Sequence, residues 1–186
     1  RWWWLSDDAK PDALSPRLLE RHLSLLGLQP LEFNRNVQAA AHLGVTYVPV
    51  NWHWVADELA YVLEDADVRA LLVGDRFTEI ALEALTDDRA NGVSLSLVVG
   101  GECEGLTDYE DFLASSATDD LPIEEQLLGG PMFYTSGTTG RPKGVRGSLS
   151  GGGSIPTEVM QLIGASMADY VPSGGRSLLV GPVYHS

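Results

Sequence analysis

The apolar positions of this chain follow two alternating spacings, one typical of helices and one typical of strands. From residue 37 an alanine-rich stretch, VQAAAHLG, stops at Gly44 and is followed by the β-branched run VTYVPV. The next segment, ADELAYVLEDAD, places apolar residues at i, i+3, i+4 and i+7, which predicts a helix with one buried stripe. VRALLV then predicts a short buried strand, so the chain repeats a helix-then-strand step.

A third step has the same form. A helical stripe runs from Phe77 to Leu85, the turn residues Asn91 and Gly92 close it, and VSLSLVV predicts another strand. Helices of this length between strands imply right-handed crossovers and a parallel sheet that is covered on both faces. The predicted fold class is therefore α/β, with alternating strands and helices that form a layered, mainly parallel sheet.

Two flanking segments follow other patterns. Residues 100–130 are acidic and rich in turn residues, with TDYEDFLASS predicted as a short helix and ATDDLPIEEQ as a surface linker. Near the N-terminus, SPRLLERHLSLLGLQP predicts one amphipathic helix between Pro16 and Pro30. Three adjacent tryptophans precede it. An aromatic anchor for a membrane or ligand is one interpretation of them, but we favour buried tryptophans or a terminus outside the native frame.

Composition and charge restrict the classes of ligand. The chain has 186 residues, 44% of them hydrophobic and 20% charged, as in soluble globular proteins. The 12 Lys and Arg residues and 26 Asp and Glu residues give a formal net charge of 12 − 26 = −14. This negative charge disfavours nucleic acid and anionic membranes as partners. Cys103 is the single cysteine and no apolar run spans a bilayer, so the cytoplasm is the expected location.

One loop has the composition of an anion site. Residues 134–145 read YTSGTTGRPKGV and follow an apolar strand that ends at Phe133 and Tyr134. Glycine lets main-chain N–H groups close on phosphate oxygens and lets the loop adopt positive φ, while Lys143 adds a positive charge. The loop differs from the Walker A motif, which needs lysine directly after its second glycine, whereas Arg141 follows Gly140 here. A short Ser, Thr and Gly turn is ordinarily only a solvated loop, but about ten ordered positions in a row favour a site.

The segment YTSGTTGRPKGV resembles the signature loop of the adenylate-forming superfamily, in its acyl-CoA synthetase branch. GVTYVPVN with DELAYVLEDADVRALLV upstream, and GPVYHS downstream, are similar to other core segments of that family. The family commonly has a Thr-His pair after Lys-Gly-Val, whereas this chain continues with Arg146, Gly147 and then SGGGS. The resemblance implies the large N-terminal domain of an adenylate-forming enzyme over residues 36–186, left incomplete and without the C-terminal domain, whereas residues 1–35 match poorly.

The resemblance also implies a reaction and a set of site residues. A carboxylic acid, with a fatty acid as the expected class, attacks the α-phosphorus of ATP with Mg²⁺, and CoA then takes the acyl group from the adenylate. The resemblance assigns phosphate binding to Thr135, Ser136, Gly137, Thr138, Thr139, Gly140 and Lys143. Tyr184 and His185 match the border of the acyl pocket, and His185 with Lys143 is assigned to catalysis, the histidine for positioning or gating. Read alone, His185 is an ordinary histidine at a strand end.

Several alternatives stay open. An adenylation domain of a peptide synthetase is the runner-up within the superfamily, although Thr138-Thr139 and Tyr184-His185 favour a CoA ligase. Both ends of the chain suggest a piece of a longer protein, and later family motifs are absent from these residues. We therefore expect nucleotide binding at most from this piece alone. A non-catalytic nucleotide-binding remnant, and a structural or interaction remnant that binds no ligand, are the other hypotheses. No residue is assigned as a metal ligand.

Overall fold

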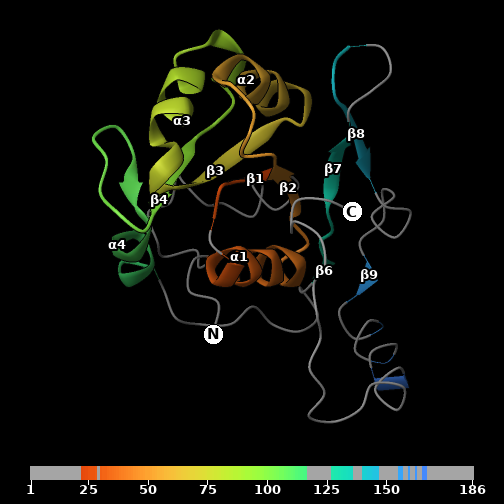
Figure 1. Ribbon diagram of the computed structural model, residues 1–186. Coiled ribbons are helices and arrows are strands. Elements are labelled where there is room, and N and C mark those ends of the chain that lie inside the picture. Colours follow the sequence, from red (N-terminus) through yellow and green to blue (C-terminus); the bar gives the residue numbers. More distant parts are fainter. Residues whose placement is uncertain are drawn as a thin grey trace.

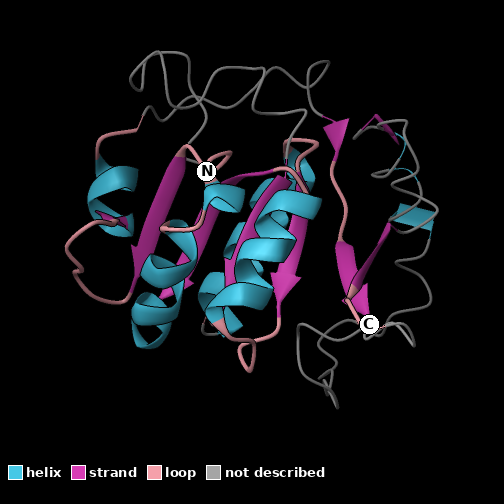
Figure 2. Cartoon of the chain, turned by 90° about the horizontal axis from the view of Figure 1, so that it is seen from above, coloured by secondary structure: helices cyan, strands magenta, loops and turns pink. Residues whose placement is uncertain are grey.

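The computed structural model describes residues 22–28, 30–116, 127–135, 140–146, 155–156, 159, 162 and 165–166. Its centre is a five-stranded sheet in the order β2-β1-β3-β4-β5, and every pair in it is parallel (Figures 1 and 2). The strands are β1 (His22–Leu26), β2 (Thr46–Val50), β3 (Val68–Gly74), β4 (Leu95–Val99) and β5 (Thr107–Asp108). The parallel α/β architecture predicted from the sequence is confirmed.

Helices cover both faces of this sheet. The helices are α1 (Pro30–His42), α2 (Ala56–Asp65), α3 (Thr78–Leu85) and α4 (Tyr109–Ala114), with single 3₁₀ turns at Asp75–Phe77 and Asp88–Ala90. In Figure 1, α2 and α3 lie above the sheet, and α1 and α4 lie below it. The helices predicted from the three apolar stripes and from TDYEDFLASS all form, although α1 begins earlier than its alanine-rich stretch.

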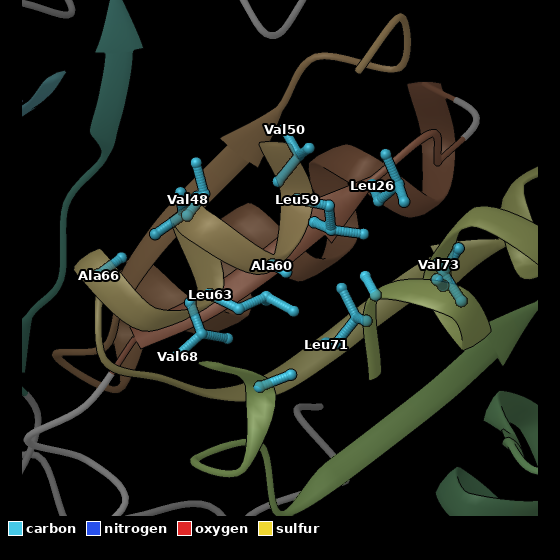
Figure 3. Close-up of a cluster of buried hydrophobic side chains, with 14 of the residues drawn as sticks. Leu26, Val48, Val50, Leu59, Ala60, Leu63, Ala66, Val68, Leu71 and Val73 are labelled. Carbon is cyan, nitrogen blue, oxygen red and sulfur yellow. The ribbon is translucent and has the colours of Figure 1, made fainter. Parts of the chain in front are cut away.

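The central strands are apolar on both sides because each side faces a helical layer. In β3, Leu71 and Val73 join the cluster under α2 and α3, whereas Ala70 and Leu72 join the cluster against α1 and α4. Figure 3 shows the first cluster, in which Leu59 of α2 and its neighbours pack onto β1, β2 and β3. Doubly covered parallel strands are expected to be continuous apolar runs, as VRALLV is.

The helix predicted between Pro16 and Pro30 is wrong where the structure describes it. His22–Leu26 forms the strand β1, which lies between β2 and β3 inside the sheet. Leu25 and Leu26, each 1% exposed, point to opposite helical layers, as consecutive residues of a strand do. Leucine spacing in this segment suits a helix, but two neighbouring strands supply pairing that no local pattern reveals. Residues 1–21, with the three tryptophans, lie outside the described residues.

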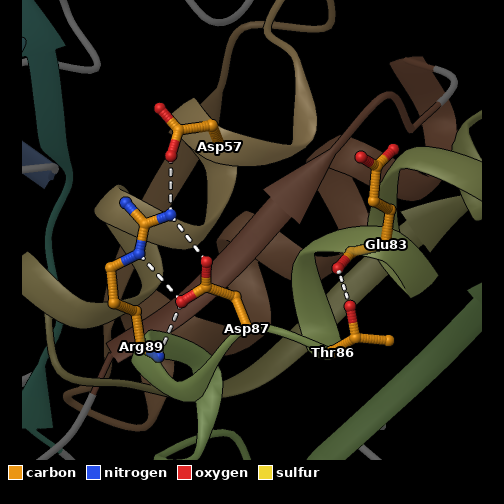
Figure 4. A network of polar contacts seen from close by, with 5 residues as sticks. All are labelled: Asp57, Glu83, Thr86, Asp87 and Arg89. Carbon is orange, nitrogen blue, oxygen red and sulfur yellow. Dashed lines mark hydrogen bonds and ion pairs between the residues drawn. The ribbon is translucent and has the colours of Figure 1, made fainter.

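An ion-paired cluster joins the start of α2 to the turn after α3. The Arg89 guanidinium lies 2.6 Å from Asp57 Oδ1 and 2.7 Å from Asp87 Oδ2, and the Arg89 main-chain N–H also donates to Asp87 (Figure 4). The hydrogen bonds from Arg89 lower the pKa of Asp87 to about 2. This cluster fixes the turn that leads from α3 toward β4.

Shorter strands follow the main sheet along the chain. β7 (Met132–Thr135) and β8 (Lys143–Arg146) form an antiparallel pair, and β6 (Leu127–Leu128) pairs with β9 (Ile155–Pro156). The chain enters β7 beside the edge strand β2, since the Tyr47 N–H donates to Gly130 O at 3.1 Å and Tyr47 also bridges Pro131. The β7–β8 pair therefore stands next to the outer edge of the sheet (Figure 1).

Candidate functional site

The strands β7 and β8 enclose the loop that the sequence predicts as a phosphate site. Thr135, the last residue of β7, pairs with Lys143, the first residue of β8, so two predicted phosphate ligands lie side by side where the loop begins and ends. Both are exposed. The apolar strand expected to end near Phe133 and Tyr134 is β7 itself, and the pairing explains why the loop needs a strand on each side.

Gly140 and Lys143 have the local properties that the prediction requires. Gly140 has a φ of +99°, a conformation that other residues rarely adopt, and a Cβ there would meet no atom within 4 Å. The backbone conformation, and not crowding, therefore demands glycine. Within the described ranges, the Lys143 ammonium has no hydrogen-bond or ion-pair partner, so its charge is available to a ligand.

The other predicted site residues are not described. Ser136, Gly137, Thr138 and Thr139 lie in the gap at 136–139, and Tyr184 and His185 lie in the gap after residue 166. Their roles stay predictions, as do the strand expected at SLLVGPV and its relation to the loop. The structure thus brings together Thr135, Gly140 and Lys143 from the predicted set.

Helix α2 contacts both ends of the loop, which no sequence pattern predicts. The Tyr61 hydroxyl donates to Pro142 O at 3.1 Å, and the Arg141 guanidinium carbon lies 5.1 Å from the centre of the Tyr61 ring. On the other strand, the Tyr134 hydroxyl donates to Asp65 Oδ2 at 2.6 Å. Tyr61 and Asp65 are separated by about one helical turn, so one face of α2 meets both β7 and the loop residues just before β8.

Tyr134 is further held by its surroundings. Trp54 meets it edge to face, with ring centroids 6.2 Å apart. Burial, and then the hydrogen bond to Asp65, raise the pKa of the Tyr134 phenol well above its usual range, so the hydroxyl keeps its proton and remains a donor. Opposite it, Gly144 leaves the space that the Tyr134 and Met132 side chains fill, since a Cβ at Gly144 would lie 3.1 Å from Tyr134 Oη.

A second place to expect a ligand is the carboxyl end of the sheet between β1 and β3, where the strand order reverses. Gly27 follows β1 with a φ of +64°, and the Phe77 ring packs so closely against it that a Cβ would collide with the ring. A Cβ on Gly74, at the end of β3, would likewise collide with the Gly27 carbonyl oxygen. The side chain of Phe77 therefore takes the space next to these strand ends, and the loop between β7 and β8 remains the better candidate.

The described residues meet neither the requirements of a metal site nor those of a membrane-spanning helix. In the parts of the chain that are described, no group of three or more His, Cys, Asp or Glu side chains is placed to hold a metal ion. Likewise, none of the helices described is both long enough and apolar enough to span a bilayer.

A family model described as AMP-binding enzyme matches residues 23–186, from β1 to the last residue. The chain belongs to this family. Within the AMP-binding enzymes it is similar to the medium-chain acyl-CoA ligase Mig of Mycobacterium avium, with 35% identity over 127 residues that make up 65% of this chain and 23% of Mig. A CoA ligase of Rhodococcus jostii for a methyl-dioxo-octahydroindenyl propanoate is 29% identical over 164 residues, which are 78% of this chain and 30% of that ligase.

Solved structures of related enzymes agree on the fold. The N-terminal domain of FACL13 from Mycobacterium tuberculosis, crystallised with an inhibitor, is 27% identical with a TM-score of 0.56, over 68% of this chain and 31% of that one. The anthranilate CoA ligase AuaEII in complex with anthranoyl-AMP has a TM-score of 0.57 at 24% identity, over 70% of this chain and 25% of that chain. This AMP-binding chain therefore has the sheet of the N-terminal domain of adenylate-forming enzymes, and it spans less than a third of the length of the curated relatives named above.

Proposed function

We propose that this AMP-binding protein activates a carboxylic acid with ATP to an acyl adenylate and transfers the acyl group to CoA, in the cytoplasm. A fatty acid is the proposed class of substrate, and the names of Mig and of a Mycobacterium tuberculosis fatty acyl CoA synthetase of 25% identity and TM-score 0.55 support it. The single observation that carries the proposal is the loop between β7 and β8, with Thr135 beside Lys143 and a left-handed Gly140.

The described residues of the hairpin support a nucleoside triphosphate as the ligand. A phosphate site needs hydrogen-bond donors and a cation without a competing partner, and Thr135, Gly140 and Lys143 supply groups of both kinds within one hairpin. When bound, ATP would supply the leaving pyrophosphate, whose growing negative charge the Lys143 ammonium stabilises. Ser136, Gly137, Thr138 and Thr139 are proposed as further donors of this loop. Mg²⁺ prefers phosphates with few carboxylates and is expected to arrive with ATP, so no described residue is assigned to it.

Residues beyond the hairpin are proposed to complete the site. Tyr184 and His185 are proposed to border the acyl group, with His185 orienting the carboxylate. The chain of 186 residues is proposed to bind nucleotide at most when isolated, because it corresponds to 23% and 30% of the two ligases described above. Turnover is therefore to be measured on the complete product of the gene.

The test is pyrophosphate release from ATP by the complete protein, with short, medium and long fatty acids and aromatic acids, each with and without CoA. We expect release with one class of acid and CoA-dependent formation of AMP. Lys143→Ala should lower kcat/KM by about 100-fold, the usual effect of losing one donor to a developing charge. Arg35→Ala is the matched loss of one positive charge, on α1 with only a 3.8 Å contact to Glu110, and should change the rate less than twofold.

The outcomes separate the hypotheses. Full activity in Lys143→Ala, or equal losses in the two variants, would refute the role of the loop. Release with amino acids alone would favour a peptide synthetase, which the 31% identity to a Penicillium rubens tripeptide synthase over 103 residues keeps as the second candidate. ATP binding without release for any acid would leave only the non-catalytic hypothesis.

A further inference from the structure

We propose that Tyr61 and Asp65 of α2 are positioning residues that hold the two ends of the phosphate loop in place, at Tyr134 and Pro142. The idea rests on the proposed function, because it states how the same loop is kept in place for ATP. Neither residue belongs to the loop, and Tyr61 reaches a carbonyl 81 residues further along the chain.

The two contacts hold opposite ends of the loop. Asp65 accepts from Tyr134, one residue before Thr135, and Tyr61 donates to Pro142, one residue before Lys143. Thr135 and Lys143 are themselves paired across the hairpin. The two residues predicted to contact phosphate are therefore each next to an anchored residue, and both anchors come from one rigid helix.

These anchors matter most for β8, because Met132 and Tyr134 of β7 already pack against the core cluster under α2 and α3. An isolated two-stranded hairpin is marginally stable in water, and β8 is largely exposed, with three of its four residues at the surface. Among the described residues, the main-chain hydrogen bond and the bridge from this segment to the sheet lie before β7, at Gly130 and Pro131. Without α2, the outgoing strand of the loop would be held by β7 alone, and a bound nucleotide would have to order it.

Arg141 and Lys143, the two cations next to the loop, have different surroundings. The Arg141 guanidinium lies over the Tyr61 ring, 5.1 Å from its centre, so this cation is engaged with α2. Lys143, two residues later, makes no such contact in the described ranges. Arg141 thus fixes the backbone at Pro142, and Lys143 keeps its charge for the phosphates.

Variants of α2 that never touch the ligand isolate the positioning effect. Tyr61→Phe removes only the hydroxyl donor, Tyr61→Leu removes the donor and the ring under Arg141, and Asp65→Asn weakens the acceptor for Tyr134. Two controls match these changes: Glu64→Gln neutralises the neighbouring exposed carboxylate, and Tyr109→Phe removes a buried hydroxyl bonded to Asn36 on the opposite face of the sheet. Tyr109→Phe therefore lowers stability without a contact to the hairpin.

The experiment has a structural arm and a nucleotide arm, both on the complete protein. Hydrogen exchange should become faster in peptides covering 132–146 for Tyr61→Leu and Asp65→Asn, and unchanged there for both controls. The dissociation constant for ATP, from calorimetry, should rise about tenfold for Tyr61→Leu and about threefold for Tyr61→Phe, as loss of one or two modest contacts predicts. In turnover, KM for ATP should rise by the same factors while KM for the acid stays within twofold.

Each outcome has a distinct meaning. Unchanged exchange at 132–146 would overturn the anchoring itself, and faster exchange with unchanged ATP affinity would overturn its role in nucleotide binding. Equal rises in KM for ATP in Tyr109→Phe and Tyr61→Leu would reduce the effect to general stability and also overturn the proposal. If the unsubstituted protein binds ATP but releases no pyrophosphate with any acid, the ligase function fails, while the binding and exchange arms still decide the role of α2.

Discussion

Gly129 precedes the hairpin and packs tightly against the main-chain atoms of Ala40 and Val45, so Gly129→Ala should show how closely this segment is joined to the sheet. It packs over the turn between α1 and β2, where the Val45 N–H donates to Ala40 O at 2.9 Å. A Cβ on Gly129 would lie 2.7 Å from Val45 N and would collide with the carbonyl oxygens of Val45 and Ala40. The atoms in the way belong to the backbone, so no side-chain rotation can relieve the contact.

The expected cost follows from these contacts. Overpacking against fixed atoms costs about 1–3 kcal/mol. Moving residues 129–131 away from the sheet would also disrupt the hydrogen bond from Tyr47 N to Gly130 O, worth about 1 kcal/mol. We therefore expect Gly129→Ala to lower the free energy of unfolding by about 2–4 kcal/mol, a large share of the 5–15 kcal/mol typical of a domain.

Gly101→Ala is the matched control. A Cβ there would lie 3.4 Å from Asp75 Cβ, an ordinary contact, and Gly101 does not have the positive φ of its neighbour Gly100. This variant should be neutral or more stable by up to about 1 kcal/mol, because alanine restricts the unfolded chain. Urea denaturation followed by tryptophan fluorescence measures both variants. Free energies of unfolding within about 0.5 kcal/mol of each other would refute the steric reasoning.

Two further predictions concern the sheet and the Arg89 cluster. Leu25→Ala should lower the free energy of unfolding by about 2–5 kcal/mol, because Leu25 is buried in β1, an interior strand of the sheet. The exposed Val55→Ala should change it by less than about 0.5 kcal/mol, and similarly small effects of both variants would contradict the placement of β1. Asp87→Asn should destabilise the protein at pH 7, because the folded-state pKa of Asp87, about 2, lies below its unfolded value of about 3.9. The difference in free energy of unfolding between the variant and the unsubstituted protein should therefore shrink as the pH falls from about 4 through 2. Urea denaturation across this pH range tests the second prediction, and a difference that is undiminished at pH 2 would argue against the ion pair as its origin.

The parts of the fold that depend on local pattern were predictable. The apolar stripe of α2 and the run of β3 are complete within about twenty residues, and a parallel sheet follows from their alternation. The strand β1 was not predictable in this way. Its leucines fit a helix as well as a strand, and only pairing with β2 and β3, which come later in the chain, decides between them.

The same distinction applies to the site. The signature loop is contiguous in sequence, so Thr135, Gly140 and Lys143 were identified together, and the structure adds the pairing and the positive φ that make the glycine necessary. The α2 contacts join residues 69 and 81 positions apart. Tyr61 lies beside the buried face of an amphipathic helix and looked like an ordinary helix residue, so nothing in its own neighbourhood indicated a partner in the loop.

The single bridge between Tyr47 and Pro131 has a consequence for association between molecules. β2 is the outermost strand on its side of the main sheet, and such a strand can recruit a strand from another copy and start aggregation. Here Pro49 within β2 and Pro131 in the segment beside β2 both lack an N–H group. A continuous ladder of hydrogen bonds along this edge is therefore interrupted in β2 and in the segment next to it. The chain then turns away into β7 and covers this border. The segment that leads to the phosphate loop thereby also protects the sheet against self-assembly.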